Sequence, residues 1–143
     1  MPPIGRVVTV LRRYDRYTLR AAWWAGVRLR ALRRELPSQG LEAHVPPPPE
    51  LPGHALRGVT GLAVVARATC LERSMLLQRW FAEHGRPYPI LVGVAITGDE
   101  GFRAHAWLEG FDPDPEAYEV MTTIDAPAPI GSTGFLATET RAR

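Results

Sequence analysis

The chain has 143 residues, of which 45% are hydrophobic and 22% are charged, with a formal net charge of +2. These values are typical of one globular domain with a hydrophobic core. The single cysteine, Cys70, excludes an intramolecular disulfide framework and any multi-cysteine metal site, and it favours a reducing compartment. No apolar run approaches the roughly 18 residues of a membrane-spanning helix, and no signal-peptide pattern is present. We therefore expect a cytoplasmic protein without a transmembrane segment.

The positive charge is concentrated near the N-terminus. All 17 basic residues are arginines, and the first 36 residues contain nine of them against Asp15 and Glu35: Arg6, Arg12, Arg13, Arg16, Arg20, Arg28, Arg30, Arg33 and Arg34. Three interpretations stay open: a solvated helix face, a docking surface for an acidic peptide or partner, or a surface for nucleic acid or anionic membrane. The acidic residues elsewhere argue against a dedicated nucleic-acid domain.

The first half of the chain predicts helices and a stiff connector. Apolar residues at helical spacing between Arg6 and Leu36 predict one long helix or two shorter ones, with Gly26 the weak point and residues 37–40 the end. Residues 45–53 read Val-Pro-Pro-Pro-Pro-Glu-Leu-Pro-Gly, which indicates an extended connector outside the core. Residues 56–68 then predict a short apolar helix.

The cysteine stands at the start of the next predicted helix. Thr69 is a suitable N-cap, and Glu72 lies three residues later, as a capping box requires. Gly85, followed by Pro87, is a stop signal, so the helix is expected from Cys70 to about residue 84. A thiol in the first turn lies at the positive end of the helix dipole, which favours the thiolate form.

Three strands are predicted after this helix. Residues 90–96 are β-branched and apolar, residues 102–109 place His105 and Trp107 on one face, and residues 118–124 form the third strand. If the loop between the last two is a simple hairpin, those two strands pair with each other in antiparallel fashion.

The order cysteine, histidine, acid supplies the three roles of nucleophilic thiol chemistry. A thiolate attacks a carbonyl carbon, an imidazole exchanges the proton, and an acid orients the imidazole. First-turn backbone N–H groups, including that of Cys70, are suitable oxyanion donors. By residue type alone, a buried structural cysteine and a satisfied core histidine at 105 stay open as alternatives.

Two signatures carry a resemblance to a known family. Thr69-Cys70-Leu71-Glu72-Arg73-Ser74 contains Cys-Leu-x-Arg-Ser, and residues 102–109 contain Ala-His-Ala-Trp-x-Glu. Together with His84-Gly85 and Val92-Gly93-Val94, they resemble the transglutaminase-like cysteine peptidases that remove leaders in lasso-peptide biosynthesis. The resemblance covers roughly residues 55–124.

The resemblance implies an α+β fold, with a transglutaminase- or papain-like core in which the cysteine helix packs on a small antiparallel sheet after N-terminal helices. We expect a basic helical segment over residues 1–45, a proline-rich connector over 46–54, the catalytic core over 55–126 and a disordered tail over 127–143. Cys70 would be the nucleophile and His105 the general base and acid. Arg73, Ser74 and Trp107 would support the site.

The implied reaction is hydrolysis of one peptide bond that releases the leader of a ribosomally made lasso precursor. The implied partners are the precursor's leader region, a separate leader-recognition protein and the ring-closing cyclase. No nucleic acid, metal or other cofactor is expected, because the sequence has no glycine-rich phosphate loop and no clustered ligand set.

The third triad member departs from the family pattern, because Ala117 stands where the family places its acid. Glu119 is the first choice, since the hairpin would bring it across from Trp107 and onto the face of His105. Asp114 is the second choice, although aspartates in a proline-rich loop usually form turns.

Two other functions stay open. One is a transglutaminase-like hydrolase or acyltransferase that acts on another peptide or amide. The other is a non-catalytic basic binding module whose cysteine and histidine are merely buried.

Overall fold

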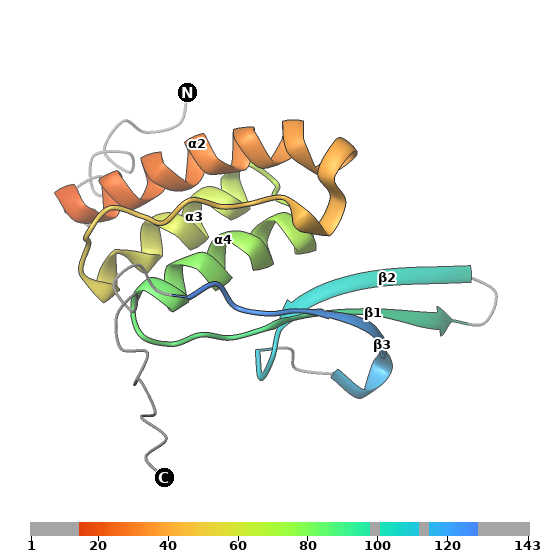
Figure 1. Ribbon diagram of the computed structural model, residues 1–143. Coiled ribbons are helices and arrows are strands. Elements are labelled where there is room, and N and C mark those ends of the chain that lie inside the picture. The colour runs from red at the N-terminus through yellow and green to blue at the C-terminus, as the bar shows by residue number, and fades with distance from the viewer. Residues whose placement is uncertain (1–14, 98–100, 112–114, 129–143) are drawn as a thin grey trace, which may run out of the picture.

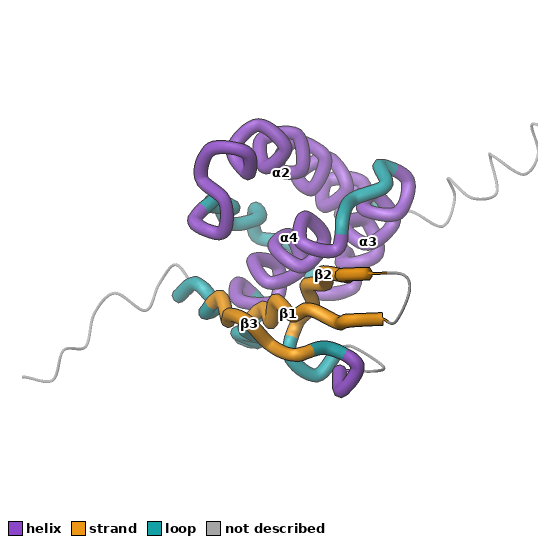
Figure 2. Tube along the Cα trace, turned by 90° about the vertical axis from the view of Figure 1, so that its right-hand side faces the viewer, coloured by secondary structure: helices purple, strands orange, loops and turns teal. Residues whose placement is uncertain are grey.

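The computed structural model describes residues 15–97, 101–111 and 115–128 (Figure 1). Its main elements are α2 (Arg16–Gln39), α3 (Leu56–Val65), α4 (Cys70–Glu83), β1 (Ile90–Thr97), β2 (Gly101–Leu108) and β3 (Glu119–Ile124). Short 3₁₀ turns lie at η1 (Gly40–Glu42), η2 (Gly53–Ala55) and η4 (Pro115–Ala117). The helices form one layer and the strands the other, with α4 between α2 and the sheet (Figure 2). The predicted α+β class is confirmed.

The basic N-terminal segment forms one continuous helix in its described part. Asp15 caps α2 by accepting a hydrogen bond from the Thr18 backbone N–H at 2.8 Å, and the helix continues through Gly26 and Pro37 to Gln39. The hydrogen bonds from Thr18 and from His54 lower the pKa of Asp15 to about 2. The cap's stabilisation is therefore complete above the ordinary aspartate pKa and is lost as the pH falls towards 2. The predicted helix start near Arg6 lies outside the described residues.

Helices α2 and α3 pack with almost no space between their backbones. A Cβ atom on Gly58 would lie 2.0 Å from the Thr18 carbonyl oxygen and 2.9 Å from the Ala22 nitrogen. Both atoms belong to the α2 backbone, so neither can move aside cheaply. Glycine at position 58 is therefore what allows this helix pair to approach.

The proline-rich connector is part of the core, so the expectation that it lies outside is wrong. Val45 and Leu51 are buried and join the hydrophobic cluster that also contains Trp24 and Trp80. The Trp24 indole N–H donates to the Pro47 carbonyl at 3.2 Å. The segment runs back along the helices and covers apolar surface that α2 and α4 leave open.

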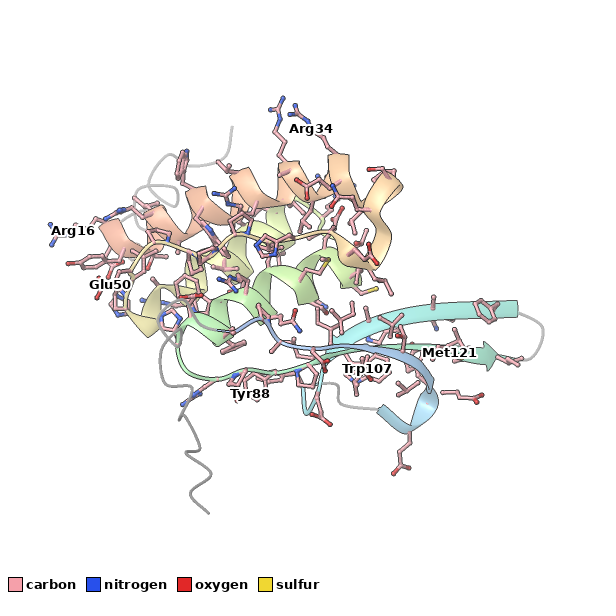
Figure 3. All side chains as sticks on the ribbon, viewed as in Figure 1. Arg16, Arg34, Glu50, Tyr88, Trp107 and Met121 are labelled. Carbon is pink, nitrogen blue, oxygen red and sulfur yellow. The ribbon has the colours of Figure 1, made fainter. Side chains whose placement is uncertain are left out.

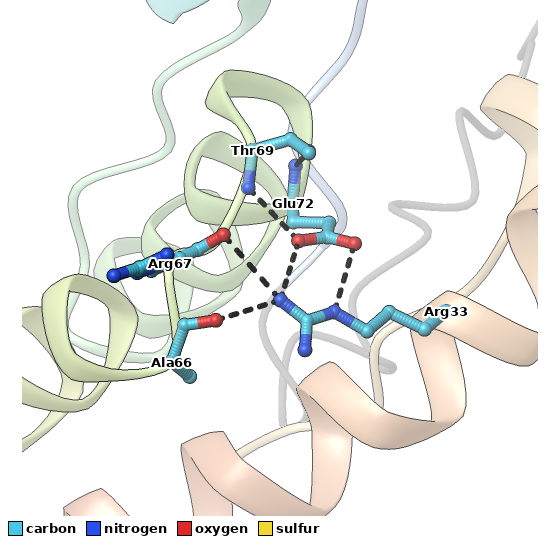
Figure 4. A network of polar contacts seen from close by, with 5 residues as sticks. All are labelled: Arg33, Ala66, Arg67, Thr69 and Glu72. Atoms are coloured by element: carbon cyan, nitrogen blue, oxygen red, sulfur yellow. Dashed lines mark hydrogen bonds and ion pairs between the residues drawn. The ribbon is translucent and has the colours of Figure 1, made fainter.

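The first turn of α4 is fixed by local and long-range contacts. The predicted capping box is confirmed: the Glu72 backbone N–H donates to Thr69 Oγ1 at 3.2 Å, and the Thr69 backbone N–H donates to Glu72 Oε2 at 2.9 Å. Arg33 of α2 adds an ion pair, with Nε 3.2 Å from Glu72 Oε1 (Figure 4). Its Nη2 also donates to the carbonyls of Ala66 and Arg67 at 2.9 and 3.5 Å.

Arg33 therefore holds the link between α3 and α4 as well as the start of α4. Arg67 in that link has a φ of 50°, a left-handed conformation that favours glycine. The helix-terminating bonds from Arg67 N–H to the Val64 carbonyl and from Ala68 N–H to the Ala63 carbonyl keep it there.

The sheet has the order β2-β1-β3, with both outer strands antiparallel to β1. The three strands begin and end within about one residue of the predicted positions. The expected hairpin between the second and third strands is wrong, because β1 lies between them. The chain leaves β2 on one side of β1 and returns as β3 on the other (Figure 1).

We expect Gly58→Ala to lower the free energy of unfolding by about 3 kcal/mol, the upper range for overpacking, because its new methyl group meets backbone atoms. Chemical denaturation measures the change. Gly53→Ala is the matched control, because nothing lies within 4 Å of its Cβ position. Equal stability of Gly58→Ala and wild type would contradict the close approach.

We expect Glu72→Ala to lower the free energy of unfolding by about 1–3 kcal/mol, since it removes the capping acceptor and leaves Arg33 without its carboxylate. Glu72→Gln should keep more of the stability, because its amide oxygen still accepts from the Thr69 N–H. Denaturant titration of both variants compares these losses. Identical stability of the alanine and glutamine variants would show that the capping box contributes little.

Candidate active site

Helix α4 is fastened to the edge strand β2 by a buried hydrogen bond. Ser74 Oγ donates to the Ala106 carbonyl at 3.1 Å, and both residues are buried. Further along both elements, the rings of Phe81 and Phe111 lie 5.4 Å apart. Because the contacts advance together along the two segments, α4 and β2 run in the same direction, as Figure 1 also shows.

By this alignment Cys70 lies level with residues 104 and 105 along β2, on the helix side of the sheet, whereas the His105 side chain projects from the other face together with Trp107. Cys70 lies one helical turn before Ser74, a step of about 5.4 Å, which corresponds to between one and two residues of a strand. One or two residues before Ala106 on β2 are His105 and Ala104. Cys70 itself is partly buried and packs against the hydrophobic core.

A groove of about 340 Å³ runs along the outer edge of β2. Its lining comes from three elements and a loop: Thr60 and Val64 of α3, Arg73, Ser74 and Leu77 of α4, His105–Leu108 of β2, and Phe111. His105 thus lines the groove together with Arg73 and Ser74 of α4, whereas Cys70 is not among its lining residues. The edge position of β2 leaves this hollow open along one side of the sheet.

The imidazole is packed between aromatic rings. His105 stacks on Trp107, with ring centroids 5.4 Å apart and an interplanar angle of 18°, and its ring lies 5.0 Å from that of Tyr118. Trp107 is buried, and Figure 3 shows it on the side of the sheet away from the helices. The prediction that Trp107 shares a face with His105 is confirmed.

Trp107 fits against the sheet because position 93 has no side chain. A Cβ atom on Gly93 would lie 2.9 Å from Trp107 Cη2 and 2.9 Å from the Glu119 carbonyl oxygen. Gly93 is also the residue that pairs with His105 in the sheet. The lack of a side chain at position 93 therefore leaves the space in which Trp107 packs beside His105.

Tyr118 is a site residue that the sequence reasoning missed. It lies just before β3, and its ring is 5.6 Å from that of Trp107 as well as near His105. An aromatic residue at the start of a strand is a common core pattern, so only the sheet order identifies its place beside the imidazole.

Glu119 does not take the place expected for the acid. In the observed register His105, Gly93 and Val120 lie in one row across the sheet, whereas Glu119 lies in the next row with Val94 and Ala104. Side chains of neighbouring rows project from opposite faces, so Glu119 does not share the face of His105. Asp114, the second choice, lies outside the described residues.

The remaining histidines serve structural roles or face solvent. His84 is half-buried, stacks on Trp80 with centroids 4.6 Å apart, and lies 2.8 Å from the Trp80 and Leu51 carbonyl oxygens. His54 contacts the N-cap Asp15 at 2.6 Å, and His44 is exposed. Over the described ranges, no group of three or more His, Cys, Asp or Glu residues is arranged to hold a metal ion.

None of the described helices is both long enough and apolar enough to cross a membrane. Comparisons with curated proteins and with solved structures find no match. A family model described as transglutaminase-like superfamily matches residues 15–123, which is more than half of the chain and includes α2, both site signatures and β1. The protein thus belongs to the transglutaminase-like superfamily.

Proposed function

We propose that the chain is a cysteine peptidase that removes the leader from a lasso-type precursor peptide. The observation that carries the proposal is the family match over residues 15–123, which includes Cys70 and His105, together with the Ser74–Ala106 hydrogen bond that packs the cysteine helix against the histidine strand. The groove shared by α4 and His105 is the place for the substrate's scissile segment. Membership in a superfamily that includes cysteine peptidases supports this chemistry.

In the first step of the proposed mechanism, the Cys70 thiolate attacks the carbonyl carbon of the scissile peptide bond. The resulting oxyanion accepts hydrogen bonds from the backbone N–H groups of Cys70 and Leu71 in the first turn of α4, since the Glu72 N–H already donates to Thr69. The C–N bond then breaks, and the His105 imidazolium gives its proton to the departing amine. The products of this step are a thioester on Cys70 and the free C-terminal fragment.

In the second step, His105 takes a proton from water as the water oxygen attacks the thioester carbonyl. The C–S bond breaks, the leader leaves as a carboxylic acid, and the Cys70 thiolate and the imidazolium are restored. Trp107 and Tyr118 pack against the imidazole ring and hold its plane fixed.

The sheet register changes the choice of the acid that orients His105. The sheet register removes the reason for choosing Glu119, since its side chain projects from the other face. Asp114 therefore becomes the first candidate. It lies four residues before Tyr118 in the sequence, and the Tyr118 ring is 5.0 Å from that of His105.

The proposed partners follow from the resemblance to lasso-peptide leader peptidases. A separate recognition protein would deliver the leader, and a cyclase would close the ring of the released core peptide. We place all of these steps in the cytoplasm, where a thiol nucleophile stays reduced.

We expect iodoacetamide to alkylate Cys70 rapidly at pH 6 in the wild-type protein. In His105→Ala the alkylation rate at pH 6 should fall about tenfold or more, because the histidine that activates the thiol is lost. Mass spectrometry of the labelled protein measures the rate. His44→Ala is the matched control, because His44 is exposed and far from β2 in the sequence. Slow alkylation that does not depend on His105 would exclude the thiolate–imidazolium pair in the free protein.

We expect the protein, together with the recognition protein, to cleave a synthetic lasso precursor between leader and core, and Cys70→Ala to abolish cleavage. Asp114→Asn should lower kcat/KM about a hundredfold or more, as loss of an orienting carboxylate does, and Glu119→Gln should stay near wild type. Chromatography of the peptide products measures these rates. A larger loss in Glu119→Gln than in Asp114→Asn would reverse the assignment of the acid. No cleavage by the wild-type pair would contradict the proposed substrate.

A further inference from the structure

The solvent-facing side of α2 carries a regular row of six exposed residues, which we name the α2 seam: Arg16, Arg20, Trp23, Val27, Arg30 and Arg34. Their spacing alternates between four and three residues, which is the spacing of the contact positions in a two-helix coiled coil. The row is basic at both ends and apolar in the middle. Its opposite side is the buried face of α2, so the seam is not needed for the core.

The middle of the α2 seam exposes large apolar side chains to solvent. Trp23 is 73% exposed and Val27 41%, and Leu19 beside them is 52% exposed. Tryptophan and arginine are the residues most often found at the energetic centre of protein interfaces. A contiguous exposed apolar patch with a polar rim is the usual mark of a binding surface.

The arginines of the seam are available for a partner. Arg20, Arg30 and Arg34 make no ion pair with any residue in the described part of the chain. Arg16 lies over the neighbouring Tyr17 ring, 4.8 Å from its centroid, and donates to the tyrosine hydroxyl. Figure 3 shows Arg16 and Arg34 projecting outwards from the two ends of α2. From position 16 to 34 the seam extends about 27 Å.

We propose that the α2 seam binds an amphipathic helix of the leader-recognition protein, whose contact face is acidic at both ends and apolar in the middle. This inference rests on the proposed function. Trp23 and Val27 would pack against the apolar centre of that helix, and the arginines would pair with its acidic ends. The partner would thus dock on the outer side of the helix layer, while the groove on the β2 edge stays free for the precursor.

Charge argues against the chain's own remaining segments and against a second copy as the occupant. Residues 1–14 contain three arginines and no acidic residue, and residues 129–143 contain two arginines and one glutamate. In a dimer built on this seam, the four arginines of one copy would face the four of the other. Each arrangement brings like charges together, which is unfavourable.

The apolar centre also separates this surface from a nucleic-acid or membrane site. A phosphate backbone is bound by cations along its length, whereas here the arginines are separated by Leu19, Trp23 and Val27. An interfacial membrane helix immerses a broad apolar face, but the broad apolar face of α2 is buried in the core. A protein helix matches the alternating pattern better than either.

The test measures binding of the purified, fluorescently labelled leader-recognition protein to the full chain carrying Cys70→Ala. We expect Trp23→Ala and the double variant Arg20→Glu/Arg30→Glu each to weaken the Kd about tenfold or more. Arg86→Glu, at an exposed arginine after α4, is the charge-reversal control outside the seam and should bind like the parent. Added salt should weaken the parent complex more than the double variant.

An unchanged Kd in both seam variants would overturn the proposal. So would seam-dependent binding of a 20-base-pair DNA duplex or of vesicles with anionic lipid in the absence of seam-dependent protein binding. Because the binding assay uses an inactive chain, its result does not depend on catalysis. The alkylation profile of Cys70 in Trp23→Ala should match wild type, so failure of the seam and failure of the peptidase are separately visible.

Discussion

The start of α4 is the point on which the rest of the structure depends, because three parts of the chain converge on it. Glu72 closes the capping box with Thr69 and at the same time receives Arg33 from α2. Arg33 also binds two carbonyls of the link from α3, where Arg67 adopts a left-handed conformation. One turn later, Ser74 fastens the helix to β2. The first turn is thus fixed relative to both the other helices and the sheet.

This arrangement determines how the elements that carry the two candidate catalytic residues are placed. The cysteine and the histidine come from different layers, so their relative position depends on the α4–β2 contact and not on either element alone. The Ser74 hydroxyl donates directly to the backbone of β2, one residue from the imidazole-bearing position. A backbone acceptor cannot change rotamer, which makes this contact more exact than one between two flexible side chains.

Local features of the structure could be predicted from the sequence, and long-range ones could not. The capping box, the glycine stop at Gly85 and the strand bounds follow from residue types within a few positions of each other. The sheet order does not follow from them, because the sequence of β3 has the same strand pattern whether the strand pairs with β1 or with β2. Burial of Val45 and Leu51 was missed for a similar reason, since the proline-rich composition predicts an extended chain but not what that chain covers.

The same division holds for the candidate site. Cys70 and His105 could be identified from their residue types, their order and the surrounding signatures. Tyr118 and the exclusion of Glu119 from the face of His105 depend on the register, in which a shift of one residue exchanges the two faces of a strand. The part of the site that the sequence left undetermined is therefore the part assembled by the sheet.

Helix α2 supports the fold on its inner side and carries the proposed docking surface on its outer side, so it cannot be exchanged between relatives without affecting both. Its inner side meets Gly58 at backbone distance, Arg33 reaches the cysteine helix, and its outer side carries the seam. A chimera that imports α2 from a relative to change its docking specificity would also import a new support for the first turn of α4. Only the surface residues that lie between the supporting residues can be replaced without changing the support of α4. Helix α2 is therefore not an exchangeable module.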